Sequence, residues 1–407
     1  MNDDRTTATS SAAPPPVLGF YGDDFAGSTA VLEVLTLAGV PAVLFVRPPS
    51  AADLAKFPGV RAFGIAGRTR SMAPAEAEGT LRLAFESFRE AGAALVHYNV
   101  CSAFNSSPTV GSAGRVMEVG LDVFGESIVP IVGGAALREH LAAQTSLPVG
   151  LLEAARVAQS PDDAMVAYEQ CCRDVGRGGV LIEPPESRPA TVGRLLLAGG
   201  RRFVIGSSAV EAALCAAWAE QDCFRPAVPL PSPGPAMPTL AVCGGTSPET
   251  AEQIRCAIRD GFVEVLLSPN ALGPGEINNA MMNAVVTVTH ALGLGRDVVL
   301  HTQTDHRIAH TPADDARLGT TLGHVLRLSL QRRRAGRVVV TGSGTAGRVA
   351  MAIGLTSLRM IAPLTPGVPL CVATAASPAI NGLHMAFKSA KAGTPDFFTR
   401  FRDGRFD

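Results

Sequence analysis

The sequence has no excess of charge of either sign and few aromatic residues. Its 35 Lys and Arg nearly balance 36 Asp and Glu, for a net charge of -1, and aromatic residues make up 5%. Because no basic excess exists to attract phosphates, we expect neither nucleic acid nor a membrane as a partner. At 47% hydrophobic and 17% charged residues, large-scale disorder is excluded, and 407 residues suffice for two or three compact domains.

Long hydrophobic runs and metal-binding cysteine motifs are also missing. No run of about 18 apolar residues appears, and residues 1–16 are polar and end in three prolines, unlike a signal peptide. The eight cysteines show no CxxC spacing, and most lie in apolar segments. We therefore expect a cytoplasmic protein with reduced thiols and a disordered tail over residues 1–16.

From Val17 onward, short apolar runs alternate with helix-length segments. Such nearly continuous apolar strands, separated by helices, are typical of parallel βαβ units. The runs are Val17–Phe20, Val43–Val46, Val60–Ile65, Ala94–Tyr98, Ile128–Val132, Thr239–Cys243, Val263–Leu267, Val298–His301 and Val338–Thr341. The sequence thus predicts an α/β fold with two α/β domains, each with a largely parallel sheet flanked by helices.

A proline-rich segment separates the two series of strands. Residues 226–238 read PAVPLPSPGPAMP, and prolines favour an extended, semi-rigid spacer. We therefore predict a first domain over residues 17–225, a linker over residues 226–238 and a second domain over residues 239–407.

The first of three glycine-rich segments, Gly22–Thr29, follows a predicted strand and precedes a predicted helix. Asp23 and Asp24 stand at the carboxyl end of that strand, where parallel sheets usually bind ligands. One carboxylate could act as a base while the other organises the turn. The alternative is that both only cap the following helix.

The second segment, Gly244–Thr250, has the same context. Ser247 is the predicted N-cap of the next helix, and Pro248 is its predicted first residue. Hydroxyl and N–H groups presented together suit phosphate, and an ordinary strand-to-helix turn is an equal alternative.

The third segment, Gly342–Gly347, matches the dinucleotide fingerprint and raises the alternative of a nicotinamide- or flavin-dependent oxidoreductase. That reaction needs an acidic residue about 20 positions further on to hold the ribose. The sequence between Gly347 and Lys388 contains no Asp or Glu. We therefore interpret this segment as a cradle for the phosphates of a mononucleotide.

Two other polar positions are weaker candidates. His301, His306 and His310 could suggest a metal site, but the neighbouring polar residues favour a loop, so we predict no protein metal site. Lys388, in another loop of small residues, could pair with phosphate, although a solvated surface lysine is the default interpretation.

Taken together, these segments resemble the four-carbon acid sugar kinase family, two-domain enzymes that phosphorylate tetronates, 3-oxo-tetronates and related acids with ATP. The matching motifs span nearly the whole chain: Gly22–Ser28 (a DD-x-TG signature), Thr69–Arg70, the substrate loop Tyr98–Pro108, the GSS motif Gly206–Ser208, and the nucleotide segments Gly244–Thr250, Gly342–Thr345 and Lys388–Gly393.

The resemblance implies a substrate-binding first domain and a nucleotide-binding second domain that uses ATP and Mg²⁺. Asp24 or Asp23 would orient or deprotonate the attacking hydroxyl. The implied substrate-binding residues are Asp23, Arg70, Asn99, Cys101, Ser102, Ser106 and Ser107, with Arg70 and the serine hydroxyls holding the acid's carboxylate and hydroxyls. The implied ATP-binding residues are Thr246, Ser247, Gly342, Ser343, Gly344, Thr345, Lys388, Ser389 and Gly393.

Several positions depart from the family pattern. Ala26 and Ala30 replace a Thr and an Asp of the first motif, Asn99 replaces the usual Lys of the substrate loop, and Gly344 replaces an Asp. The alternative function is therefore a degenerate homologue that binds an acidic metabolite or nucleotide without efficient phosphoryl transfer. The general prior for soluble proteins favours a homodimer.

Overall fold

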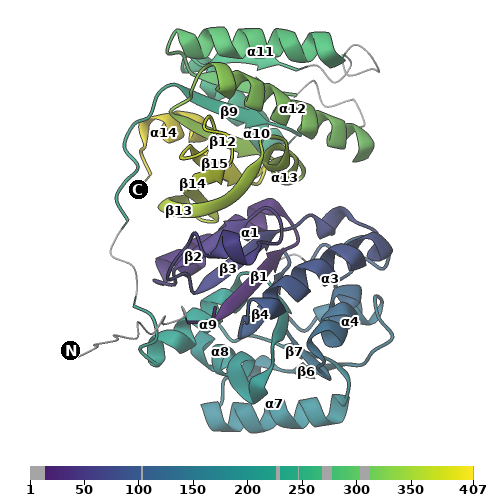
Figure 1. The fold of residues 1–407 in the computed structure, drawn as a ribbon. Coiled ribbons are helices and arrows are strands. Elements are labelled where there is room, and N and C mark those ends of the chain that lie inside the picture. Colours follow the sequence, from purple (N-terminus) through teal and green to yellow (C-terminus); the bar gives the residue numbers. More distant parts are fainter. Residues whose placement is uncertain are drawn as a thin grey trace, which may run out of the picture.

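The computed structural model describes residues 14–101, 104–225, 230–245, 247–267, 277–302 and 312–406. Within these residues the chain forms two lobes (Figure 1) that share one 15-stranded sheet. The strand order is β10-β11-β9-β12-β15-β14-β13-β2-β3-β1-β4-β8-β5-β7-β6. The predicted α/β fold, with a mostly parallel sheet flanked by helices, is confirmed.

The first lobe contains an eight-stranded parallel part of the sheet. Its strands are β1 (Leu18–Gly22), β2 (Ala42–Phe45), β3 (Ala62–Ala66), β4 (Leu95–Asn99), β5 (Ile128–Val132), β6 (Val149–Leu152), β7 (Gly178–Ile182) and β8 (Phe203–Gly206). Its helices are α1 (Phe25–Leu37), α2 (Ala51–Leu54), α3 (Pro74–Glu90), α4 (Ala113–Phe124), α5 (Leu137–Ala142), α6 (Ala154–Val157), α7 (Pro161–Val175), α8 (Pro189–Leu197) and α9 (Ala209–Glu220).

Helices cover both faces of this part of the sheet, which explains the continuous apolar runs. Leu18 and Phe20 of β1 belong to one buried apolar cluster, whereas Tyr21 belongs to another. Since successive strand residues point to opposite faces, a strand covered on both faces is apolar at most of its positions. Among the described helices, none has the length and apolar character to cross a membrane.

The second lobe combines parallel and antiparallel strands. Its strands are β9 (Thr239–Cys243), β10 (Val263–Leu266), β11 (Val298–His301), β12 (Arg337–Thr341), β13 (Leu355–Thr365), β14 (Val368–Ala375) and β15 (His384–Lys388). Its helices are α10 (Pro248–Arg259), α11 (Ile277–Gly293), α12 (Pro312–Arg332), α13 (Ser343–Ala352) and α14 (Phe397–Asp403). The β13–β14 hairpin is antiparallel, an arrangement that the apolar runs did not predict.

The lobes are joined by strand pairing and by the packing of a helix. β13 pairs antiparallel with β2 through Ser357 with Phe45 and Leu358 with Leu44, which makes the sheet continuous. Helix α1 also packs on the second lobe, where the rings of Phe25 and Phe387 lie 4.5 Å apart between centroids. The proline-rich residues 230–238 contain no helix or strand and run along the outside of this junction (Figure 1).

Candidate active site

The candidate site is built on the carboxyl ends of four adjacent strands of the first lobe. Across β3, β1, β4 and β8, the parallel register aligns Ala66, Gly22, Asn99 and Gly206. The chain leaves the sheet just after each of these residues. Side chains that are far apart in the sequence therefore meet at one edge, where parallel sheets commonly bind ligands.

Asp23 and Asp24, just after β1, both pair with Arg70 in the short 3-10 turn Thr69–Ser71 (η1). Arg70 donates from Nε and Nη2 to the two carboxylate oxygens of Asp23, at 3.1 and 2.7 Å, and from Nη1 to Asp24. Asp24 also caps α1 by accepting from the backbone N–H of Gly27 at 2.6 Å. Asp24 thus caps the following helix, as the alternative interpretation expected, and also binds Arg70. The Asp23 side chain does not cap the helix and binds Arg70.

This cluster is buried and carries one negative charge when both aspartates are ionised. Asp23 is 5% exposed and Asp24 is 7% exposed. Burial raises the pKa of Asp23 to about 6, although the guanidinium of Arg70 favours the ionised form. Arg70 therefore holds two carboxylates in place near neutral pH and neutralises one of them.

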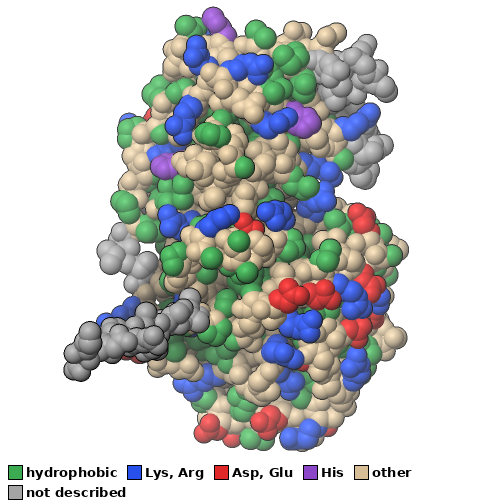
Figure 2. Space-filling model, in the orientation of Figure 1, with side chains coloured by type: hydrophobic (Ala, Val, Ile, Leu, Met, Phe, Trp, Pro, Cys, Tyr) green, Lys and Arg blue, Asp and Glu red, His purple; other side chains and the backbone are tan. Residues whose placement is uncertain are grey.

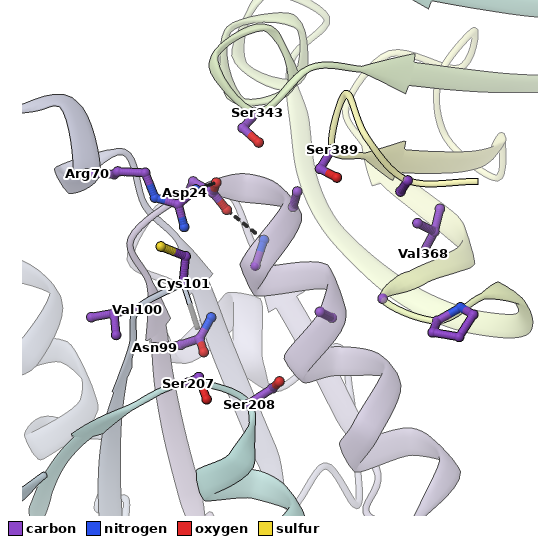
Figure 3. Close-up of a pocket in the computed structure, with 16 residues that line it drawn as sticks. Asp24, Arg70, Asn99, Val100, Cys101, Ser207, Ser208, Ser343, Val368 and Ser389 are labelled. Carbon is purple, nitrogen blue, oxygen red and sulfur yellow. Dashed lines mark hydrogen bonds and ion pairs between the residues drawn. The ribbon is translucent and has the colours of Figure 1, made fainter. Parts of the chain in front are cut away.

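A cavity of about 270 Å³ lies beside the cluster and between the lobes (Figure 3). We call it the central cavity. Its wall comes from the strand ends and α1 of the first lobe, and from the first turn of α13, the β13–β14 turn and the loop after β15 of the second. The lining residues are Asp24, Ala26, Gly27, Ala30, Arg70, Asn99, Val100, Cys101, Ser207, Ser208, Ser343, Pro366, Gly367, Val368, Ser389 and Ala392.

An adjoining cavity of about 290 Å³, the side cavity, shares Asp24, Arg70 and Ser343 with the central one. It also contains Arg68 and Arg348, so cations line it from both lobes. Figure 2 shows that Lys and Arg side chains gather where the lobes meet on the face drawn. Within the side cavity, the carboxylates of Asp23, Asp24 and Glu76 balance the three arginines in number.

Two glycine-rich loops of the second lobe pack tightly against each other. A Cβ at Gly244 would lie 2.0 Å from Oγ1 of Thr345, and one at Gly342 would lie 2.7 Å from the carbonyl oxygen of Gly244. Gly342 also has a φ of 105°, which side chains rarely adopt. This contact fixes the first turn of α13, whose Ser343 reaches the central cavity.

The second glycine segment supports the loop after β15. Ser247 is the N-cap of α10 and Pro248 follows it in the first turn, as predicted. The hydroxyls of Ser247 and Thr250 donate to the carbonyl of Ala390 at 3.2 and 2.9 Å. Gln253 donates to three further carbonyls of this loop. Ser247 thus positions the loop that presents Ser389 to the cavity.

Lys388 is fully buried, so the solvated interpretation is wrong. Its ammonium donates to the carbonyl of Ser389 at 3.1 Å and lies 5.4 Å from the centroid of Phe397. Burial lowers its pKa to about 8. Gly393 ends the loop with a φ of 83° and closely approaches Phe397.

The predicted site residues do not all meet at the cavity. Ser106 hydrogen-bonds His140 and Gln144 at 2.9 Å each, while Ser107 bonds within its own loop, and neither lines the central or side cavity. Ser102 and Thr246 lie outside the described residues, as do His306 and His310. Across the described ranges, no group of three His, Cys, Asp or Glu could hold a metal.

Two parts of the cavity wall were not among the predicted site residues. Ser207 and Ser208 belong to the GSS motif, so their position after a predicted strand was an available signal. Pro366 and Gly367 form the β13–β14 turn and reach the cavity only because the hairpin packs on α1.

The segment after α13 also excludes the dinucleotide alternative, because β13 pairs with β14 and β2 and not with β12.

Known proteins match both halves of the chain. The family descriptions "sugar-binding N-terminal domain" and "nucleotide-binding C-terminal domain" match residues 18–136 and 240–398. The chain is 32% identical to a 3-oxo-isoapionate kinase of Paraburkholderia graminis, covering 98% of this chain and 97% of that one. It is 26% identical to a 3-oxo-tetronate kinase of Methylobacterium radiotolerans, covering 95% and 98%. It is 28% identical to a D-threonate kinase of Cupriavidus necator, covering 47% and 44%.

A solved structure shares the fold. A Salmonella typhimurium LT2 protein matches with a TM-score of 0.74 and 19% identity, covering 95% of this chain and 99% of that one. At this identity the likeness shows the fold alone.

Proposed function

This chain belongs to the four-carbon acid sugar kinase family, and on that premise we propose that it transfers the terminal phosphoryl group of ATP to a hydroxyl of a small sugar acid. A tetronate, a 3-oxo-tetronate or a branched oxo-acid such as 3-oxo-isoapionate would be the acceptor, in line with the substrates named for its relatives. A central cavity of about 270 Å³ suits an acceptor of that size.

The position of Asp24 carries this proposal. Asp24 lines both the central and the side cavity, and Ser343 at the N-terminus of α13 lines both as well. A hydroxyl in the central cavity could therefore contact Asp24 while a phosphate occupies the N-terminus of α13. Phosphoryl transfer requires this alignment of nucleophile and phosphate above all else.

In this mechanism Asp24 orients the acceptor hydroxyl and takes its proton as the phosphoryl group transfers. Arg70 acts through its bonds to both aspartates and so positions Asp24. Asp23 lines only the side cavity, which makes it the supporting carboxylate. Asn99 and Cys101 would contact the acid from the central cavity. The roles of Ser102, Ser106 and Ser107 stay predictions.

The ATP phosphates would contact residues Gly342–Thr345 and Ser389. Ser389 belongs to the loop after β15, which Ser247, Lys388 and Gly393 hold in place. Mg²⁺ characteristically binds one or two carboxylates together with nucleotide phosphates and water. The carboxylates of Asp23 and Glu76, which line the side cavity together with Ser343, fit that donor set. Bound there, the ion would neutralise charge on the phosphates, and it would enter with ATP.

The second candidate, a binder without efficient turnover, also has an observation in its favour. Ala26 and Ala30 line the central cavity at the positions where the resemblance expects a Thr and an Asp. Their methyl groups offer no hydrogen bond to an acceptor. This candidate predicts ATP or acid binding with no ADP formation.

Magnesium-dependent ADP release tests the proposal, with 3-oxo-isoapionate, 3-oxo-tetronate and D-threonate as acceptors. Asp24→Asn should lower kcat about 100-fold or more, because the amide cannot take the proton. Asp162→Asn, an exposed position on α7, is the matched control and should retain wild-type kcat. Full turnover in Asp24→Asn would remove the proposed base. Binding without ADP release by the wild-type protein would favour the second candidate.

A further inference from the structure

Three of the five N–H donors of Arg70 are already used by the two aspartates, which bears on where the acid's carboxylate binds. Nε and Nη2 donate to Asp23, and Nη1 donates to Asp24. With both aspartates ionised, two negative charges face one positive charge at this end of the central cavity. A substrate carboxylate placed here would meet a net negative charge.

The opposite end of the central cavity, in contrast, presents groups that favour an anion. After β8, Ser207 and Ser208 turn into α9, a helix of 12 residues, and both line the cavity (Figure 3). Among the described residues, neither their backbone N–H groups nor the hydroxyl of Ser208 donates to an acceptor. A helix N-terminus with free N–H groups favours an anion.

The one acidic residue in the first turn of α9, Glu211, does not line the central cavity. Glu211 is fully buried and contacts Nδ1 of His97, whose Nε2 lies 3.1 Å from the carbonyl oxygen of Gly206. The His97–Glu211 pair therefore contacts the last residue of β8. The positive end of the helix is therefore left to the cavity.

Asn99 supplies an independent sign of a ligand. The side chain is 3% exposed, lines the central cavity, and lies between Gly22 of β1 and Gly206 of β8 in the register. Neither its Oδ1 nor its Nδ2 forms a hydrogen bond with another described residue, so the Nδ2 donor is available to an anion in the cavity. A buried amide without a partner costs free energy unless a ligand or water satisfies it.

We propose that the first turn of α9, through Ser207 and Ser208, binds the carboxylate of the acceptor acid, and that the amide of Asn99 donates to the same group. The acid would then lie along the central cavity, with its anionic end at α9 and its reacting hydroxyl at Asp24. This assignment rests on the proposed kinase function and adds the direction in which the substrate binds.

A charge placed at the N-cap of α9 tests this direction. The Ser208 side chain makes no capping hydrogen bond, so Ser208→Asp removes none and the helix should form normally, while the new carboxylate repels that of the substrate. With 3-oxo-isoapionate as the probe, KM should rise about 30-fold or more, and KM for ATP should change less than about twofold. The methyl ester of the same acid, which is neutral, should be affected far less. Ser160→Asp, at the exposed N-cap of α7, is the matched control and should behave as wild type.

Asn99→Asp, which preserves the size of the side chain, should reproduce the selective rise in KM. If both variants phosphorylate 3-oxo-isoapionate with wild-type KM, or if KM for the acid and its ester rise equally, the carboxylate subsite is wrong. If the wild-type protein releases no ADP with any of the three acids, the proposed function fails separately. Titration of 3-oxo-isoapionate alone then decides the subsite: binding that Ser208→Asp abolishes supports it, and absence of wild-type binding overturns it.

Discussion

The buried charge of Lys388 offers a quantitative test of how the second lobe is built. Burial lowers the pKa of this side chain from 10.5 to about 8. Because one pKa unit corresponds to about 1.4 kcal/mol, keeping Lys388 protonated at neutral pH costs the folded state about 3 kcal/mol. The carbonyl of Ser389 and the ring of Phe397 compensate only part of the lost hydration.

Lys388→Met should therefore raise the free energy of unfolding at pH 7 by about 1 to 3 kcal/mol, since it fills the same space without a charge. The gain should shrink with rising pH. The folded protein releases this proton near pH 8 and the unfolded chain near pH 10.5, so the wild-type penalty is complete below pH 8 and fades through that window. Near pH 10 the variant should have lost most of its advantage.

Urea unfolding followed by circular dichroism at pH 7 and near pH 10 measures both quantities. Lys391→Met is the matched control: this lysine lies three residues on, is exposed, and should change stability by less than about 0.5 kcal/mol. The reasoning is refuted if Lys388→Met is less stable than wild type at pH 7, or if its gain is the same at both pH values. Since the charge also favours phosphates near Ser389, calorimetry should show ATP binding about tenfold weaker in Lys388→Met.

Two further predictions concern the junction and the phosphate cradle. Glu33 of α1 accepts from the backbone N–H of the β13–β14 turn at 2.5 Å, and burial raises its pKa from 4.5 to about 7. Because the folded state favours the protonated carboxyl, the wild-type free energy of unfolding falls as pH rises through 7, whereas Gln does not titrate. In urea unfolding, the stability advantage of Glu33→Gln over wild type should therefore grow by about 3 kcal/mol between pH 5 and pH 8, and a constant difference would contradict this. Gly244→Ala should lose about 1 to 3 kcal/mol and weaken ATP binding, because its Cβ would meet Thr345 at 2.0 Å. Gly79→Ala, in open space on α3, should be neutral or stabilising, and equal behaviour of the two variants would rule out the steric explanation.

Several features of the site were predictable because their signals are local. Asp24 and Ser247 each follow a strand and precede a helix, and both cap that helix in the structure. The same context marked Gly342, whose positive φ begins α13. Strand-to-helix turns leave their N–H groups and short polar side chains at the carboxyl edge of a parallel sheet, so sequence order alone brings these residues to one edge.

Other predictions failed or fell short because they depend on distant packing. Lys388 looked like a surface lysine, since small residues follow it in the sequence, but its side chain is fully buried and its ammonium packs over the ring of Phe397. Ser106 lies in a serine-rich segment that suggested substrate contacts, yet His140 and Gln144 take its hydroxyl. Which partner a polar side chain finds is decided by elements far away in the sequence.

The sequence by itself determined the alternation of strands and helices, the glycine-rich turns and the family resemblance, because periodicity, capping and turn chemistry act over a few residues. Only the tertiary structure decided that β13 joins the two lobes by pairing with β2, and that Arg70 is shared by two aspartates. It alone placed Ser208 at the other end of the cavity from that cluster. These features depend on contacts between distant segments, whose geometry is set by the packing of the whole sheet.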